Sequence, residues 1–242
     1  MRRIKIFDTI FFDCKYSEIR NFFFNKGYLV IPSGPGLSEI FKNTLYKNAL
    51  NESTIAIFDS SLLCLLLRLI KIKVSKFSGY KLLRNLFDDF KKTNCKVLLV
   101  DPTKEDSKIN QLYINQLNEN ISTVTYIAPY YKEDFEDKKL VKIINKEIPN
   151  YIIINLGGFT QEPLANYLYK NIKTNSFIIC SGAAIAFFTG RQAKVNSLID
   201  NAYLGWLVRC FENPKLFIPR YLKAFKLIHV FLKNKDKVIE LK

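Results

Sequence analysis

The sequence predicts an α/β protein with a Rossmann-like parallel-sheet core and a C-terminal helical appendage. Short apolar, β-rich runs alternate with longer segments of helical periodicity, which is typical of βαβ units. Several of the short runs are continuously apolar, as expected of parallel strands that are buried on both faces. The chain has 242 residues, of which 48% are hydrophobic, so there is enough apolar material for a large core.

The expected elements follow one another in an alternating order. The strands are predicted at Ile4–Phe12, Tyr28–Ile31, Thr54–Phe58, Lys96–Val100, Ser122–Ile127, Tyr151–Asn155 and Ser176–Cys180. The helices are predicted at Tyr16–Asn25, Leu37–Leu50, Tyr80–Thr93, Lys108–Asn118, Asp134–Lys146 and Pro163–Ile172. This order favours a core in which each strand is followed by a helix that crosses back over the sheet.

The pattern changes after Gly190, where no further strand signal is found. Tyr203–Phe211 and Phe217–Leu232 have the periodicity of helices. We therefore expect an α/β catalytic core over residues 1–190 and a basic helical appendage over residues 191–242.

The charge of the chain favours an anionic partner. There are 37 Lys and Arg residues against 22 Asp and Glu, a net charge of +15. Such a balance is typical of proteins that bind nucleic acid, an anionic membrane surface or phosphorylated substrates. A general preference for lysine in the source genome is the alternative explanation for part of this excess.

The cysteine and histidine counts exclude several classes of site. The five cysteines are odd in number, scattered and form no C-x-x-C, which indicates a reducing compartment without a disulfide framework or a zinc site. His229 is the only histidine, so metal sites with two or more histidine ligands are excluded. It is expected to be a core or interface residue.

The sequence contains no candidate membrane span. The most apolar stretch, Ser61–Ile70, is far shorter than the roughly 20 residues needed and contains Arg68. The segment Met1–Asp8 has the pattern of a first strand, and not of a signal peptide.

Polar or glycine-rich segments follow three of the predicted strands, where ligands of open α/β sheets bind. Asp59 follows Thr54–Phe58, with capping of the next helix as the alternative role. Gly157 and Gly158 would let a ligand approach the backbone near a helix N-terminus. Gln161 and Glu162 could bind sugar or ribose hydroxyls, although an ordinary βα loop explains them as well.

A third loop, Ile31–Gly36, follows the second predicted strand and is rich in Gly and Pro. It suits a tight loop against a ligand, and Ser33 is its polar side chain. A plain turn is the alternative. Lys76 precedes a predicted helix, where one more solvated lysine is the plain explanation.

Three C-terminal stretches resemble the signature of the WecG/TagA/CpsF glycosyltransferases, which are family 26 enzymes. They are Cys180–Arg191, Leu204–Arg209 and Asn213–Lys215. Upstream, Asp59, Lys76–Gly79 and the Gln161-Glu162 pair match further family motifs in the same order. The resemblance covers the chain from about Tyr28 to Tyr221.

The resemblance implies a metal-independent hexosyltransferase without a cofactor. Asp59 would be the general base that takes the acceptor's proton. The substrate-binding residues would be Ser33, Lys76, Gly157, Gly158, Gln161, Glu162, Arg191, Arg209 and Arg220, with the arginines on the diphosphate. No metal site is expected, because Asp59 has no acidic neighbour at D-x-D spacing.

The resemblance also implies the partners. The donor would be a UDP-linked N-acetylhexosamine or its uronate, and the acceptor a polyprenyl-diphosphate-linked sugar in surface polysaccharide biosynthesis. The enzyme would be cytoplasmic and peripheral on the inner face of the membrane. Basic and apolar residues alternate at helical spacing in the predicted Phe217–Leu232 helix, which either rests on the anionic membrane surface or packs on the body of the protein with its lysines in water. On the membrane, its apolar anchors would be Phe225, Leu227, Phe231 and Leu232. No nucleic acid is expected, and a homo-oligomer is left open.

The chain departs from the family pattern at several positions. Ser60 replaces a Gly, Phe159-Thr160 replace Pro-Lys, Ala186 replaces an acidic residue and Gly205 replaces a Glu. Two alternatives therefore stand beside the enzyme. One is a catalytically degenerate member that binds the nucleotide sugar, and the other is a basic Rossmann-like module that binds nucleic acid.

Overall fold

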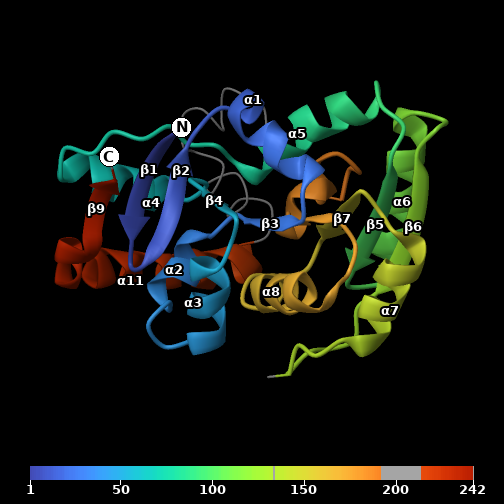
Figure 1. The fold of residues 1–242 in the computed structure, drawn as a ribbon. Helices are drawn as coiled ribbons and strands as arrows, with labels where there is room; N and C mark the ends of the chain where they lie inside the picture. Colours follow the sequence, from blue (N-terminus) through green and yellow to red (C-terminus); the bar gives the residue numbers. More distant parts are fainter. Residues whose placement is uncertain (133, 192–213, 242) are drawn as a thin grey trace.

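The computed structural model describes residues 1–132, 134–191 and 214–241 (Figure 1). Within this part of the chain lies a sheet of nine strands, in the order β6-β5-β7-β8-β3-β4-β2-β1-β9. The strands are β1 (Arg2–Ile6), β2 (Thr9–Asp13), β3 (Gly27–Val30), β4 (Ile55–Ile57), β5 (Lys96–Asp101), β6 (Ser122–Ile127), β7 (Tyr151–Ile154), β8 (Phe177–Cys180) and β9 (Val238–Leu241). All neighbouring pairs from β6 to β2 are parallel, whereas β1 pairs antiparallel with β2 and with β9.

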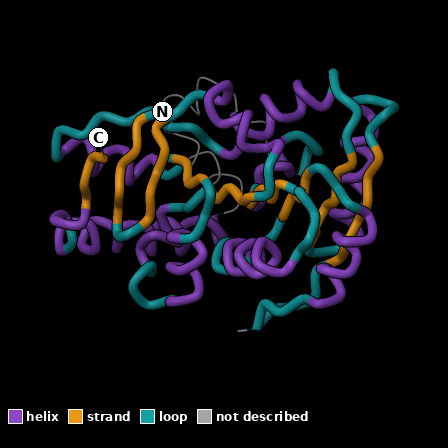
Figure 2. The backbone as a smooth tube through the Cα atoms, in the orientation of Figure 1, coloured by secondary structure: helices purple, strands orange, loops and turns teal. Residues whose placement is uncertain are grey.

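Helices cover both faces of this sheet (Figures 1 and 2). The helices and 3-10 turns are α1 (Tyr16–Ile19), η1 (Arg20–Phe24), α2 (Gly34–Ser38), α3 (Thr44–Asn51), α4 (Ser61–Leu69), α5 (Gly79–Phe90), α6 (Lys104–Leu117), α7 (Lys138–Glu147), α8 (Gln161–Asn171), η2 (Gly182–Phe187), α11 (Pro214–Lys233) and η3 (Lys235–Lys237). One apolar cluster joins the sheet to α2, α3, α4, α7, α8 and α11. The other joins it to α1, η1, α5, α6 and η2. The predicted α/β class with a Rossmann-like parallel core is confirmed.

The first predicted strand is in fact a hairpin. β1 and β2 pair with Ile6 opposite Thr9, and the turn between them is Phe7-Asp8. Both turn residues have positive φ, 53° and 78°, which is the backbone of the two-residue turn that matches the twist of antiparallel strands. Phe7 tolerates this conformation because its side chain is fully buried in the core. The hairpin reverses the chain, so β1 and β2 are separate strands.

The predicted helix Leu37–Leu50 is divided in two. α2 ends at Ser38 and α3 starts at Thr44, where Asn43 caps the new helix by accepting the N–H of Tyr46 at 2.9 Å. An Asn side chain satisfies an otherwise unpaired helix N–H, so this residue favours a fresh start over continuation.

The C-terminal segment adds both a helix and a strand to the body. Ala224, Leu227 and Phe231 on α11 are buried in the main core. β9 then pairs with β1 along the sheet edge, with Ile4 opposite Glu240. The expectation that no strand follows Gly190 is therefore wrong, because an edge strand pairs on one side only and needs no continuous apolar run. The predicted helix Tyr203–Phe211 lies outside the described residues.

The burial of α11 also corrects two of the four expected membrane anchors. Leu227 and Phe231 are 0% and 1% exposed, so they pack against the protein itself. Phe225 and Leu232 lie on the opposite side of the helix and are 54% and 59% exposed. His229, expected in the core or at an interface, is exposed on that outer side.

Phe231→Ala should lower the free energy of unfolding by about 3–5 kcal/mol, because it removes a large buried ring and leaves a cavity. The neighbouring Leu232→Ala should change it by less than about 0.5 kcal/mol, since that side chain is largely in water. Urea unfolding of both variants measures the difference. Equal effects would contradict the packing of α11 on the core.

Candidate active site

Four parallel strands end next to one another at the centre of the sheet, in the order β7-β8-β3-β4. Because parallel strands share a direction, the loops that follow them emerge at one edge. These loops carry the residues that sequence reasoning selected. They are Ser33 after β3, Asp59 after β4, and Gly157, Gly158, Gln161 and Glu162 after β7.

Asp59 contacts the N-terminus of a helix that is not its own. Its Oδ1 accepts the N–H of Gly79, the first residue of α5, at 3.2 Å. Ser60 is the residue that caps α4, by accepting the N–H of Leu63. Asp59 therefore does not cap the helix that follows it. The half-buried carboxylate lies at the N-terminus of α5, the positive end of that helix's dipole.

The segment before α5 runs beside the end of β4. The N–H of Phe77 donates to the carbonyl of Phe58 at 2.7 Å, which brings Lys76 next to the Asp59 turn. Gly79 is packed closely, since a Cβ there would lie 3.3 Å from atoms of Ile31 and of Ala184. The ends of β3, β4 and β8 are thus joined around the start of α5.

The loop after β7 is held by its own buried polar side chains. Gln161 Oε1 accepts the N–H of Gly182 at 2.8 Å, and Gln161 Nε2 donates to Glu162 Oε1 at 3.2 Å. Glu162 Oε2 accepts the N–H of Phe159 at 3.0 Å. Gln161 and Glu162 are 5% and 1% exposed. Gln161 therefore fixes this loop to the turn after β8, and Glu162 fixes the loop to itself.

Phe159 adopts a left-handed backbone with a φ of 69°, which a bulky side chain rarely adopts. Its ring packs against Tyr46 of α3, with the centroids 4.8 Å apart, and this contact helps to hold the conformation. Proline, which the resemblance implies at this position in the family, has φ fixed near −65° and could not adopt this backbone conformation.

Neither packing nor backbone conformation requires glycine at the two glycine positions of this loop. A Cβ on Gly157 or Gly158 would meet nothing within 4 Å, and neither residue has a left-handed φ. Their backbone is open to the outside, at the start of the turn that leads into α8. Because glycine has no side chain, a ligand could approach the main chain closely at these two positions.

Ser33 caps α2 by accepting the N–H of Gly36 at 3.3 Å. A Cβ on the adjacent Gly34 would lie 3.1 Å from Ser60 Oγ and 3.5 Å from the Ala224 methyl of α11. The loop after β3 therefore contacts both the Asp59 turn and the C-terminal helix. In this way α11 reaches the edge where the four strands end.

A buried hydrogen-bond network at the same edge was missed from the sequence. Asp101, at the end of β5, has no exposed surface, and its Oδ1 accepts the amide groups of Asn110 and Asn155, each at 2.7 Å. The Ser181 hydroxyl donates to Asn155 Oδ1 at 2.8 Å. Burial raises the pKa of the Asp101 carboxyl, against the opposing effect of these amides. Like Asp59, Asp101 directly follows an apolar strand, and that signal could have found it.

The arginines expected on the diphosphate are only partly described. Arg191 is exposed and pairs with Glu105 at 2.9 Å and with Asp106 at 3.1 Å, both in the first turn of α6. Arg209 lies outside the described residues. Arg220 lies in α11, but its side chain is not among those described. In the described ranges, no three His, Cys, Asp or Glu side chains gather as metal ligands.

Comparison with known proteins supplies the family. The family model described as "Glycosyl transferase WecG/TagA/CpsF family" matches residues 6–238, nearly the whole chain. None of the curated proteins compared with this chain matches it. The matched range includes every strand from β2 to β8 and every loop of the edge described above. The chain therefore belongs to the WecG/TagA/CpsF family and is a glycosyltransferase.

Proposed function

We propose that this glycosyltransferase of cell-surface polysaccharide biosynthesis uses Asp59 as its general base. The acceptor hydroxyl would attack the anomeric carbon of a nucleotide sugar, Asp59 would take the hydroxyl proton, and the nucleoside diphosphate would leave. The observation that carries this role is the position of Asp59. Its carboxylate lies where β3, β4 and β8 meet, on the N-terminus of α5.

The open backbone at Gly157-Gly158 supports a donor site beside this base. A nucleoside diphosphate is anionic, and the amide groups at the start of α8 suit phosphate oxygens. We assign Gln161 and Glu162 to holding this loop, because both side chains are buried and accept the N–H groups of Gly182 and Phe159, respectively. Ser33 and Lys76 border the same edge, where Lys76 supplies a positive charge near Asp59.

We further propose that Arg191, Arg209 and Arg220 neutralise the diphosphate as it leaves. Arg191 would exchange its two carboxylate partners for phosphate oxygens, which match the guanidinium fork equally well. The donor is proposed to be a UDP-linked N-acetylhexosamine or its uronate. The acceptor is proposed to be linked to polyprenyl diphosphate, and the reaction to need no metal ion.

The outer side of α11 supports a membrane-facing role for this helix on the inner face of the cytoplasmic membrane. Ile218, Leu222, Phe225 and Leu232 are exposed at helical spacing. Lysines follow the same helix, and helices of this composition rest on anionic lipid surfaces. No helix of the described ranges is both long and apolar enough to span a bilayer.

A catalytically degenerate member is the second candidate, because Ser60, Ala186 and Gly205 depart from the family pattern. The structure bears on the first of these, since Ser60 forms a regular helix cap directly after Asp59. The turn is therefore well formed without the family glycine, which favours the active enzyme.

Asp59→Asn should lower turnover by about 10²–10⁴-fold, because an amide cannot take the acceptor proton. Binding of UDP-N-acetylhexosamine and the midpoint of thermal unfolding should stay close to wild type, since the amide oxygen can still accept from Gly79. Product formation and donor titration measure the two effects separately. Turnover at the wild-type rate would overturn the role of Asp59.

Gly158→Ala should weaken donor binding about tenfold or more, as the methyl group would stand between the ligand and the backbone. The same substitution should leave the free energy of unfolding unchanged or raise it by about 0.4–1 kcal/mol, since it restricts the unfolded chain. Calorimetric titration measures the donor affinity, and urea unfolding measures the free energy of unfolding. Undiminished donor affinity in a stable variant would place the donor elsewhere.

Leu222→Ser combined with Phe225→Ser should reduce binding to anionic vesicles about tenfold, because two exposed apolar side chains leave the bilayer. Salt should release the wild-type protein as well, through screening of its lysines. The matched control is Leu45→Ser with Leu69→Ser, which removes exposed leucines from α3 and α4. Co-sedimentation measures binding, and equal loss in both double variants would contradict a specific role for α11.

A further inference from the structure

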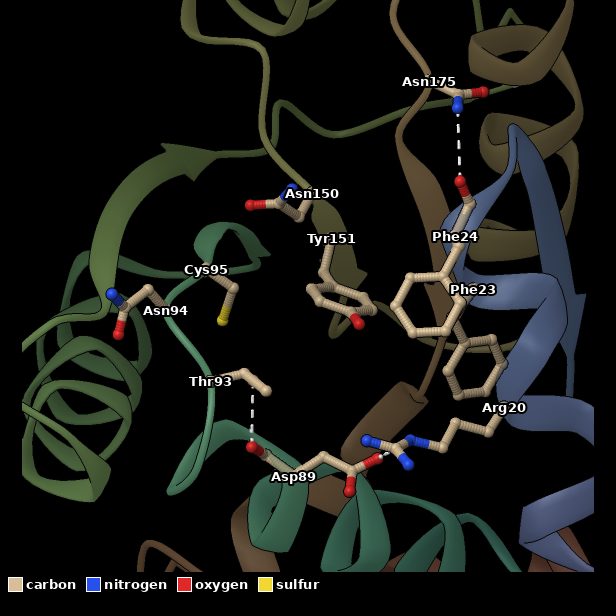
Figure 3. A pocket seen from close by; sticks show the side chains of 10 residues that line it. All are labelled: Arg20, Phe23, Phe24, Asp89, Thr93, Asn94, Cys95, Asn150, Tyr151 and Asn175. Atoms are coloured by element: carbon tan, nitrogen blue, oxygen red, sulfur yellow. Dashed lines mark hydrogen bonds and ion pairs between the residues drawn. The ribbon is translucent and has the colours of Figure 1, made fainter.

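A hollow lies at the edge of the sheet opposite to the candidate active site, where β5, β7 and β8 begin (Figure 3). It has a volume of about 370 Å³, within the range of small-molecule sites, which is about 300–1,000 Å³. β5 and β7 have six and four residues, so this edge lies roughly 13–20 Å from the Asp59 edge at about 3.3 Å per residue. The hollow is therefore separate from the candidate active site.

Aromatic rings form one side of this hollow. Figure 3 shows the rings of Phe23, Phe24 and Tyr151 along it, with Cys95 on the other side. Phe23 is buried and meets Tyr151 edge-on, with the centroids 6.5 Å apart. Phe24 is 62% exposed at the rim, so its ring is accessible to a ligand that enters the hollow.

Two asparagine side chains at the hollow are held in place by hydrogen bonds to backbone N–H groups where β5 and β3 begin. Asn150 Oδ1 accepts the N–H of Lys96 at 2.8 Å, which leaves its Nδ2 group without a hydrogen bond among the described residues. Asn175 Oδ1 accepts the N–H of Lys26 at 2.8 Å, and its amide donates to the carbonyl of Phe24. Amides that are already oriented can bind a ligand without a further loss of side-chain freedom.

The charge at this edge disfavours an anionic ligand. Arg20 is neutralised by Asp89 at 2.8 Å, and Asp89 also accepts the Tyr16 hydroxyl at 2.7 Å. Asp89 lies in the last turn of α5, and a helix C-terminus carries partial negative charge. Burial raises the pKa of the Cys95 thiol to about 11, so that this side chain is neutral as well. Phosphate groups therefore have little to bind here.

We propose that this hollow is a saccharide-binding site that takes an uncharged sugar unit. The apolar face of a sugar ring would pack on Phe24 and Tyr151, while its hydroxyl or acetamido groups bond to Asn150 and Asn94. Aromatic rings with a few fixed polar groups are the usual lining of small-ligand sites. The link to the enzyme's own glycan rests on the proposed function. A site so far from Asp59 would hold a glycan near the enzyme and raise its local concentration.

The test is a titration of the full ¹⁵N-labelled chain with N,N′-diacetylchitobiose and, separately, with UDP. The disaccharide should shift the backbone amides of Phe24, Cys95 and Tyr151, with a dissociation constant in the millimolar range. Phe24→Ala should weaken this binding about tenfold. Tyr130→Ala, which removes another highly exposed ring (89%) that does not line the hollow, should leave it unchanged.

The outcomes separate this site from the catalytic proposal. If UDP shifts residues at the Asp59 edge while the disaccharide shifts none at the hollow, the saccharide site is refuted and the proposed function stands. If the disaccharide binds at the hollow and UDP binds nowhere, the saccharide site is supported and the donor assignment fails. Loss of self-association in Phe24→Ala without saccharide shifts would show a contact between copies and overturn the proposal.

Discussion

The candidate site depends on one buried carboxylate, that of Asp101. Removing a carboxylate from water is costly unless hydrogen bonds replace the lost solvation, and the amides of Asn110 and Asn155 replace part of it here, at Oδ1. Through Asn155 and Ser181 these bonds tie the ends of β5, β7 and β8 to one another. The next residue along, Gly182, then holds the Gln161 loop. The arrangement of the candidate site thus follows from a carboxyl group placed where water cannot reach it.

Most of the sheet could be predicted from the sequence because strands that are buried on both faces consist mainly of apolar residues. Short β-rich runs, several of them continuously apolar, identified every strand from β3 to β8. The hairpin at Phe7-Asp8 could not be predicted, because its positive φ values fall on residues that rarely adopt them. β9 was missed because it is short and largely exposed at the edge. Both faces of α11 carry apolar residues, so periodicity alone could not show that Phe231 faces inward and Phe225 outward.

The candidate site was predictable as far as topology determines it. Parallel strands share a direction, and Asp59 and the loop at Gly157 were therefore expected at one edge. The directions of individual side chains depend on tertiary contacts that spacing does not encode. Gln161 and Glu162 turn inward to hold the loop, and Arg191 pairs with acidic residues far away in the sequence. The hollow beside Phe24 combines residues from η1, α5, β5 and β7, which no linear motif brings together.

The pairing of β1 with β9 has a consequence for how the protein folds during synthesis. Arg2 pairs with Glu240, 238 residues later, so one side of β1 stays an open strand edge until translation reaches β9. Contacts of such long sequence separation form slowly, and unpaired edges invite association with other chains. Three of the five residues of β1 are basic, namely Arg2, Arg3 and Lys5. Their like charges would repel a second nascent chain at that edge, which protects the protein until its own last strand arrives.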